Sequence, residues 1–105
     1  MKIYTSTGLV FGNYWGGGQG AYKAENLEAQ SKEELISKAE EMIKNGSLDS
    51  GMGYESLLGA ILNITETEVI TKNGKEYRHE ESETEMIGDL TENQQDFLMD
   101  GLYSI

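Results

Sequence analysis

One acidic stretch constrains the fold of this chain more than any other feature of its sequence. Residues 76–100 contain nine acidic side chains and one basic side chain, so these 25 residues carry a charge of −8 out of −11 for the whole chain. Like charges gathered on a small domain repel each other and oppose compaction. We therefore expect these acidic side chains to lie on the surface, where they either confer solubility alone or meet a cationic partner.

The sign of the charge excludes several classes of partner. Residues 53–105 hold twelve acids and three bases, whereas residues 1–52 hold seven acids and five bases. A domain that binds DNA or RNA through phosphates needs a positive surface, so we expect no direct contact with nucleic acid. Anionic membrane surfaces are disfavoured for the same reason, and no apolar run is long enough to cross a bilayer.

Length and amino-acid usage predict one small domain. The chain has 105 residues, no internal repeat and no long linker, so we expect a single domain over residues 1–105. The absence of cysteine excludes disulfides, zinc–thiolate sites and a cysteine nucleophile. The chain also has thirteen glycines and no proline, so its turns depend on Gly, Asn, Asp and Ser.

The first part of the chain predicts a β-hairpin. Residues 2–11 alternate between two faces, as a strand does. Residues 12–20 follow, with five glycines around Tyr14 and Trp15, a composition typical of a loop. Residues 21–29 are expected to return as the second strand, although their composition also suits a helix.

The clearest helix signal begins at Ser31, which forms a capping box with Glu34. Apolar residues then recur at helical spacing and make one stripe. The stripe consists of Leu35, Ile36, Ala39, Met42 and Ile43. Asn45 and Gly46 are expected to end the helix, because glycine readily adopts the left-handed conformation of a C-cap.

The middle of the chain predicts a second, shorter helix followed by a strand. Residues 47–53 are expected to be a flexible connection. A short helix is predicted over residues 54–60, with Leu57 and Leu58 facing inward. Residues 61–71 are rich in Ile, Thr and Val and predict a strand.

Asn73-Gly74 predicts a tight hairpin turn, because a type I′ turn needs positive φ at both central residues. Pairing across this turn sets Ile70 opposite Tyr77, Glu68 opposite His79, and Glu66 opposite Glu81. The last pair is like-charged, which destabilises a β-ladder. We therefore expect fraying or a bulge at Glu81.

The end of the chain predicts a further helix. Met86 and Ile87 are expected to form a short strand or to anchor a loop. Thr91 and Gln94 form a second capping box, which begins a helix expected to run to Asp100. Around this helix we expect burial of Phe97 and Leu98, termination at Gly101, and packing of Leu102, Tyr103 and Ile105 against the core.

Taken in order, the predicted elements read β-β-α-(α)-β-β-α. This order predicts an α+β fold, with an antiparallel sheet of about four strands and two main helices packed on one face. The bracketed helix is the short one over residues 54–60.

The glycine-rich loop allows two interpretations besides a simple hairpin tip. Gly16-x-Gly18-x-x-Ala21 fits the dinucleotide-binding pattern, but no capped helix follows to direct its N-terminus at a pyrophosphate. The Gly-Lys-Ser/Thr of a P-loop is also missing. Tyr14 and Trp15 instead have the composition of an interface anchor, since aromatic residues are enriched at binding hot spots. Packing of Trp15 into the core is an equal alternative.

Patterns for catalysis or metal binding are weak. His79 is the only histidine, and we expect it to pair with Glu68 at the surface, without a nucleophile or further nitrogen ligands. The calcium-loop pattern fails directly after Asp49. Glycosidase-like chemistry needs two carboxyl groups in one cleft, and the acidic residues are instead spread over strand, turn and helix. We therefore expect no enzymatic activity, no cofactor and no metal.

Three short segments resemble one class of small proteins. They are Tyr4-Thr5-Ser6, Tyr14-Trp15-Gly16 and Ser31-Lys32-Glu33-Glu34-Leu35. With these segments in an acidic chain without cysteine or proline, the protein resembles small accessory proteins of phages and mobile elements. Among these are anti-CRISPR and anti-restriction proteins, several of which are DNA mimics. Residues 2–45 are also similar to the first segment of antirestriction proteins of the ArdA type, from which the chain departs in length and in its glycine run. The resemblance assigns no functional residue.

The acidic stretch and the resemblance together predict an inhibitor that imitates the charge of DNA. Carboxylates along a hairpin and a helix would occupy the basic groove of a host protein or ribonucleoprotein. The inhibitor would act in the cytoplasm of the host cell. The sequence does not predict its oligomeric state. The expected partner-binding residues are Glu76, Glu80, Glu81, Glu83, Glu85, Asp89, Glu92, Asp96, Tyr14 and Trp15. The alternative is a non-catalytic interaction module or homodimer that uses the aromatic loop, with acidity serving only solubility.

Overall fold

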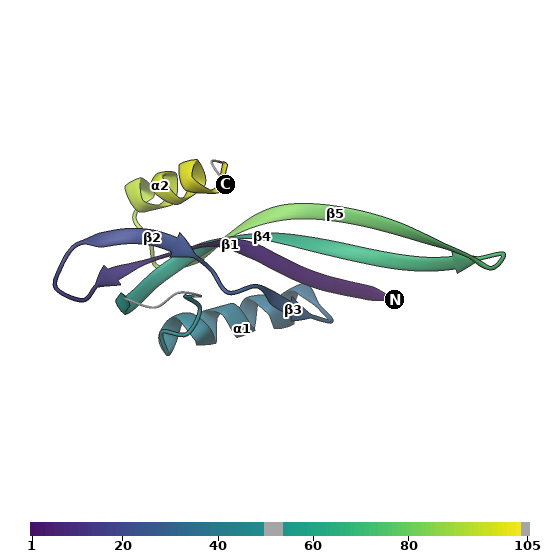
Figure 1. The fold of residues 1–105 in the computed structure, drawn as a ribbon, viewed down its shortest axis with the longest axis horizontal. Helices are drawn as coiled ribbons and strands as arrows, with labels where there is room; N and C mark the ends of the chain where they lie inside the picture. Colours follow the sequence, from purple (N-terminus) through teal and green to yellow (C-terminus); the bar gives the residue numbers. More distant parts are fainter. Residues whose placement is uncertain (50–53, 104–105) are drawn as a thin grey trace.

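The protein folds around one long antiparallel sheet with a helix on each side (Figure 1). The computed structural model describes residues 1–49 and 54–103, and the molecule measures 59 × 25 × 21 Å along its principal axes. In chain order the elements are β1 (Lys2–Tyr14), β2 (Gln19–Lys23), β3 (Leu27–Ala29), α1 (Lys32–Lys44), β4 (Tyr54–Lys72), β5 (Lys75–Gly88) and α2 (Glu92–Tyr103).

β1 and β4 form the centre of the sheet. They pair over nearly the whole length of β1, from Lys2 opposite Glu68 to Tyr14 opposite Tyr54. The other edge of β1 pairs with both β2 and β3, which lie one after the other along it. β5 pairs with β4 and forms the opposite edge of the sheet, in the order β2-β1-β4-β5.

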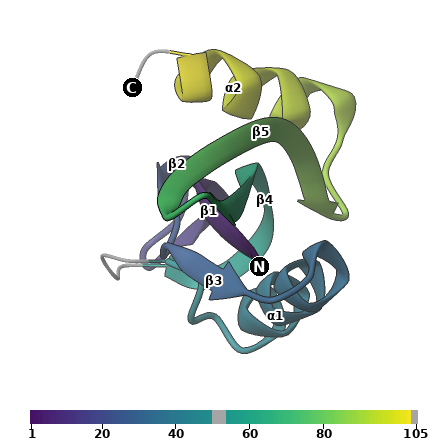
Figure 2. The same ribbon diagram turned by 90° about the vertical axis from the view of Figure 1, so that its right-hand side faces the viewer.

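Each face of the sheet carries its own helix, as Figure 2 shows. Each face also has its own hydrophobic cluster. We call the faces the α1 side and the α2 side. The core of the α1 side includes Val10, Leu27, Leu35, Ala39, Leu48, Leu57, Leu62, Ile64 and Ile87. The core of the α2 side includes Leu9, Phe11, Ile61, Leu90 and Leu98.

The predicted fold class is therefore wrong in its proportions and its layering, because the sheet dominates the fold, although the predicted element order and strand count fit roughly. The described residues form five strands rather than about four, and the two helices cover opposite faces rather than one. The cause lies in adjacent apolar pairs, because successive side chains of a strand point to opposite faces. Leu9 and Val10 are both buried, as are Ile61 and Leu62, so both faces of the central strands need a cover.

The short helix predicted over residues 54–60 is also wrong, because β4 already begins at Tyr54 and continues through this segment. Leu57 belongs to the core of the α1 side, whereas Leu58 packs against that of the α2 side. A continuous apolar run suits a strand that is buried on both faces as well as it suits a short helix. Of the predicted connection at 47–53, residues 50–53 lie outside the described residues.

The first hairpin is confirmed, with a change in its return strand. β1 and β2 pair around the glycine-rich loop, with Asn13 opposite Gln19. The predicted strand over residues 21–29 is divided into β2 and β3, and Ala24 lies between them in an isolated bridge with Asp49. Both pieces pair with β1, so the segment stays extended as predicted.

The local start and turn signals are confirmed. The Ser31 side chain accepts a hydrogen bond from the Glu34 amide at 3.1 Å, and Gly46 has a positive φ of 74° after the C-cap. The Asn73-Gly74 turn has φ values of 53° and 75°, as a type I′ turn requires. The second capping box is reciprocal: the Thr91 amide donates to the Gln94 side chain at 3.0 Å, and the Gln94 amide donates to the Thr91 hydroxyl at 3.3 Å.

The last helix differs from the prediction at its end. α2 continues through Gly101 to Tyr103, so Gly101 does not terminate it. Leu98 is fully buried as predicted, but the Phe97 side chain is 54% exposed and meets Phe11 only edge-on, with ring centroids 5.9 Å apart. Leu102 packs against the core of the α2 side. Ile105 and the side chain of Tyr103 lie outside the described part of the chain.

The hairpin register is confirmed in all three predicted pairs, but the predicted fraying or bulge at Glu81 is wrong. Glu66 lies opposite Glu81, and the β4–β5 ladder passes this pair without a shift in register. Each carboxylate has its own local partner. The Tyr4 hydroxyl donates to Glu66 at 3.0 Å, and Glu81 contacts His79 at 3.1 Å, so the two charges are not left facing each other alone.

The backbone of β4 lies close against Gly8, and we predict that this position tolerates no side chain. A Cβ atom at Gly8 would lie 2.0 Å from the Ile61 carbonyl oxygen on the paired strand. Gly8→Ala should therefore lower the free energy of unfolding by about 3 kcal/mol, the upper end of ordinary overpacking costs. Urea unfolding followed by circular dichroism measures the loss.

Gly74→Ala is the matched control. No atom lies within 4 Å of where a Cβ at position 74 would be, so only the positive φ of 75° opposes the substitution. The free energy of unfolding should therefore fall by about 1 kcal/mol. Equal losses in the two variants would contradict the close-approach explanation.

Candidate functional site

The predicted acidic residues do not form one continuous face. Ile87 of β5 belongs to the core of the α1 side and Met86 packs on the α2 side, so the odd-numbered side chains of β5 point to the α1 side and the even-numbered ones to the α2 side. The α1 side thus receives Glu81, Glu83 and Glu85, and the α2 side receives Glu76 and Glu80. Asp89 lies in the connection to α2, and Glu92 and Asp96 lie on α2 itself.

On the α1 side, the acids of β5 are tied to the beginning of α1. The Lys32 ammonium forms ion pairs with Glu83 and with Glu85, the latter at 2.6 Å. Hydrogen bonds to these two carboxylates raise the pKa of Lys32. The Lys32 contacts therefore join the first turn of α1 to the edge strand of the sheet.

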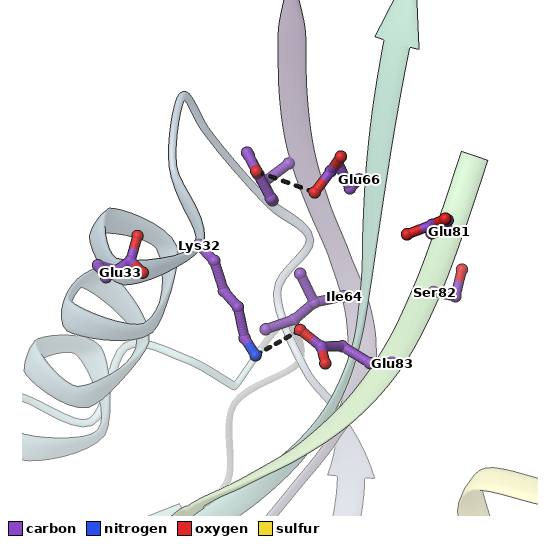
Figure 3. A pocket seen from close by; sticks show the side chains of 8 residues that line it. Lys32, Glu33, Ile64, Glu66, Glu81, Ser82 and Glu83 are labelled. Atoms are coloured by element: carbon purple, nitrogen blue, oxygen red, sulfur yellow. Dashed lines mark hydrogen bonds and ion pairs between the residues drawn. The ribbon is translucent and has the colours of Figure 1, made fainter. Parts of the chain in front are cut away.

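A recess of about 300 Å³ lies beside this contact (Figure 3). We call it the acidic recess, and it is lined by Tyr4, Lys32, Glu33, Ile64, Glu66, Glu81, Ser82 and Glu83. It combines four carboxylates with a single ammonium group, so its chemistry favours a cationic guest over an anionic one.

Besides Glu83, which pairs with Lys32, and Glu81, which contacts His79, a third carboxylate of the recess is engaged. Glu66 accepts the hydrogen bond from the Tyr4 hydroxyl and forms an ion pair with Lys2 at 3.4 Å. The Tyr4 hydrogen bond lowers the pKa of Glu66, and Lys2 acts in the same direction. The same hydrogen bond raises the pKa of Tyr4, and hydrogen bonding to Glu66 raises the pKa of Lys2.

On the α2 side, Arg78 is the one basic residue of β5, and it forms no ion pair among the described residues. Glu80, Asp89, Glu92 and Asp96 are exposed and make no ion pair within residues 1–49 and 54–103. We call these four residues the α2-side acidic surface. α2 contains no Lys or Arg, and Glu92 and Asp96 stand one helical turn apart on it.

Tyr14 and Trp15 lie in or beside the loop between β1 and β2. The loop between β1 and β2 and the turn between β4 and β5 occupy opposite ends of the long axis (Figure 1). Tyr14 stacks on Tyr54, with ring centroids 5.0 Å apart, whereas the Trp15 side chain is 70% exposed. Trp15 is thus not packed into the core.

Sequence reasoning missed the residues that fix the α1 side. His79 contacts Glu81 rather than the predicted Glu68, although Glu68 is its cross-strand neighbour. Lys32 was part of a recognised helix start, but nothing local connects it with Glu83, fifty-one positions later. Only the register of β4 on β5, together with the docking of α1, brings these groups together.

The described residues contain no arrangement of three or more His, Cys, Asp or Glu side chains suited to a metal ion. Neither α1 nor α2 is long and apolar enough to cross a membrane. Comparison of the chain with family models, with curated proteins and with solved structures finds no match.

The lowered pKa of Glu66 predicts an acid-dependent loss of stability. Because the folded-state pKa lies below the ordinary value of 4.5, the ionised carboxylate stabilises the fold fully above that value, and its contribution disappears as the pH falls through the folded pKa. The melting temperature of wild type should therefore exceed that of Glu66→Gln at neutral pH, and the difference should shrink towards zero in acid.

Glu68→Gln controls for the change in net charge. The Glu68 carboxylate makes no hydrogen bond or ion pair within the described residues and lies on the same face of β4. Its substitution should leave the melting temperature nearly unchanged at neutral pH. If both variants melt alike, the bonds from Tyr4 and Lys2 contribute nothing to stability.

Proposed function

We propose that this protein is a non-catalytic inhibitor that binds a cationic groove of a nucleic-acid-handling complex, of the anti-CRISPR or anti-restriction type. The α2-side acidic surface is the proposed contact. The observation that carries the proposal is the exposure of Glu80, Asp89, Glu92 and Asp96 without any ion-pair partner among the described residues.

The composition of α2 supports a role beyond folding. Glu92, Asp96 and Asp100 follow each other at four-residue spacing, and like charges at this spacing each cost a helix a few tenths of a kcal/mol. A helix that tolerates these costs without basic residues is consistent with selection for its surface charge.

The magnitude of the charge limits the kind of mimicry. A net charge of −11 over a length of 59 Å gives one net charge for about every 5 Å, whereas a DNA duplex carries one for about every 1.7 Å. The molecule is therefore too weakly charged to imitate a whole duplex along its length. The proposal is local: carboxylates on the α2 side compete for part of a basic groove, helped by electrostatic steering.

The acids of the α1 side have a different role in this proposal. Glu83 and Glu85 are engaged by Lys32, so their reversal to lysine would disturb the attachment of α1 as well as any partner contact. Substitutions on the α2-side acidic surface avoid this ambiguity.

The triple variant Glu80→Gln, Glu92→Gln, Asp96→Asn tests the proposal. In a fluorescence-anisotropy assay, wild-type protein should displace labelled duplex DNA from at least one purified CRISPR effector or restriction complex. The triple variant should need at least about tenfold more protein, since three long-range attractions to the groove are removed. Raising the ionic strength from about 0.01 M to about 1 M shortens the Debye length from about 30 Å to about 3 Å and should abolish the wild-type effect.

The matched control is Glu28→Gln, Glu40→Gln, Glu41→Gln, which removes the same charge from exposed positions on β3 and α1. This control should displace DNA as well as wild type does. If both triple variants displace DNA equally poorly, the displacement depends only on net charge. If wild-type protein displaces DNA from no complex at low salt, the proposal is refuted.

A second candidate function rests on the exposure of Trp15. A tryptophan with 70% of its side chain exposed, in a loop rich in glycine, resembles an interface anchor for a partner or for a second copy of the chain. In this candidate the acidity serves solubility only.

Trp15→Ala separates the two candidates. If the α2-side acidic surface makes the contact, Trp15→Ala should displace DNA like wild type and elute at the same volume in size-exclusion chromatography. Loss of displacement or a change in oligomeric state in Trp15→Ala, with the triple acidic variant unaffected, would favour the aromatic loop.

A further inference from the structure

The outer edge of β5 is the longest unpaired strand edge in the described chain. β5 has fourteen residues and ends the strand order, and no hydrogen bond among residues 1–49 and 54–103 reaches its outer backbone groups from a further strand or loop. The opposite edge of the sheet is divided between β2 and β3, with five and three residues. Short edge strands of this kind limit unwanted pairing, whereas β5 is long enough to accept a whole additional strand.

The turn geometry indicates which groups face outward. Lys72 and Lys75 flank the two-residue turn and so form a hydrogen-bonded pair. Hydrogen-bonded and non-hydrogen-bonded pairs alternate along an antiparallel ladder. The odd-numbered residues of β5 are therefore bonded to β4, and the even-numbered residues, such as Glu80, Ser82 and Thr84, turn their N–H and C=O groups outward.

Most devices that usually protect an exposed edge are absent from β5. The chain has no proline, the β4–β5 register shows no bulge, and residues 79–88 contain no lysine. Charge is the remaining protection. Antiparallel pairing of β5 with its own copy, centred on Glu83, would set Glu83 opposite Glu83 and Glu81 opposite Glu85, which is destabilising. A strand of opposite charge would instead bring cations to these carboxylates.

We propose that the outer edge of β5, over residues 78–84, binds an extended basic segment of a partner protein as an additional β-strand. The backbone groups that face outward would bond the segment, and the acidic side chains on both faces of β5 would select lysine or arginine. This inference deepens the proposed function, on which it rests for the cationic nature of the partner.

The acidic recess supplies a place for one of the basic side chains. Glu81 and Glu83 project from β5 on the α1 side and line the recess together with Glu33 of α1 (Figure 3). A strand added to β5 would place its own α1-side residues about 5 Å from these carboxylates. Lys32 is the only ammonium group that lines the recess, so a second cation from the partner would bring its charge closer to balance.

Amide hydrogen exchange tests the pairing without any substitution. The probe is a synthetic peptide of about six residues, an ordinary strand length, in which lysine alternates with valine and threonine. At saturating peptide, the amides of Glu80, Ser82 and Thr84 should exchange at least about tenfold more slowly, because each gains a hydrogen-bond partner. The amides of Glu81 and Glu83, already bonded to β4, should change little.

The control ligand is a peptide of identical sequence and charge in which alternate backbone nitrogens are methylated. The methylated nitrogens are those that would otherwise donate hydrogen bonds to β5. The control peptide should bind at least about tenfold more weakly in isothermal calorimetry, since it keeps the charge and loses the strand hydrogen bonds. Equal binding of both peptides, with unchanged exchange at the outward amides, would overturn strand addition and leave the charge-based function intact.

Thr84→Pro and Thr84→Val provide the matched pair of variants. Thr84 is exposed and its side chain makes no hydrogen bond within the described residues. Proline removes the outward N–H at an edge position where the β4 ladder does not need it, whereas valine keeps the N–H. Thr84→Pro should weaken peptide binding at least about tenfold, and Thr84→Val should not.

The remaining outcomes separate strand addition to β5 from the proposed inhibitor function. If the Thr84→Pro variant folds normally and binds the alternating peptide as tightly as wild type does, the inference is overturned. If the alternating peptide fails to bind while wild-type protein still displaces DNA from a nucleic-acid-handling complex, the inference fails and the proposed function stands. Failure of both assays rejects both.

Discussion

The pairing of β1 with β4 is the interaction on which the rest of the molecule depends. Both strands are buried on their two faces over their middle parts, with Leu9 and Val10 on one and Ile61 and Leu62 on the other. A ribbon that is apolar on both faces exposes a hydrophobic surface unless each face is covered. α1 and α2 provide the two covers, and Gly8 allows the backbones to approach closely where a side chain would collide.

This two-sided arrangement gives the acidic residues two different environments. On the α1 side, Lys32 holds Glu83 and Glu85, so charge contributes to the attachment of a helix. On the α2 side, α2 contains no basic residue and packs its apolar face on the sheet around Leu98. The same excess of negative charge thus serves packing on one face and remains available to a partner on the other. The proposed inhibitor depends on this difference between the faces, whereas the proposed strand addition uses carboxylates of both.

Features encoded within a few residues could be predicted, and features that depend on distant partners could not. The caps at Ser31 and Thr91 and the turn at Asn73 need only their neighbours, and all three are present. The bulge expected at Glu81 is absent because the partner of the opposing Glu66, the Tyr4 hydroxyl, comes from β1. Neither the β1–β4 pairing nor the contact of Lys32 with β5 leaves a local signal in the sequence.

By itself, the sequence determined the elements with strong local chemistry, the register of the β4–β5 hairpin and the negative charge of the second half. Turn geometry sets a hairpin register, and side-chain ionisation sets the charge, whatever the rest of the chain does. Only the tertiary structure decided that the helices lie on opposite faces, that the acids divide between the α1 side and the α2 side, and that β5 has an open edge. These outcomes depend on which strands become neighbours, and that choice is made by burial of apolar surface summed over the whole sheet rather than by any one segment.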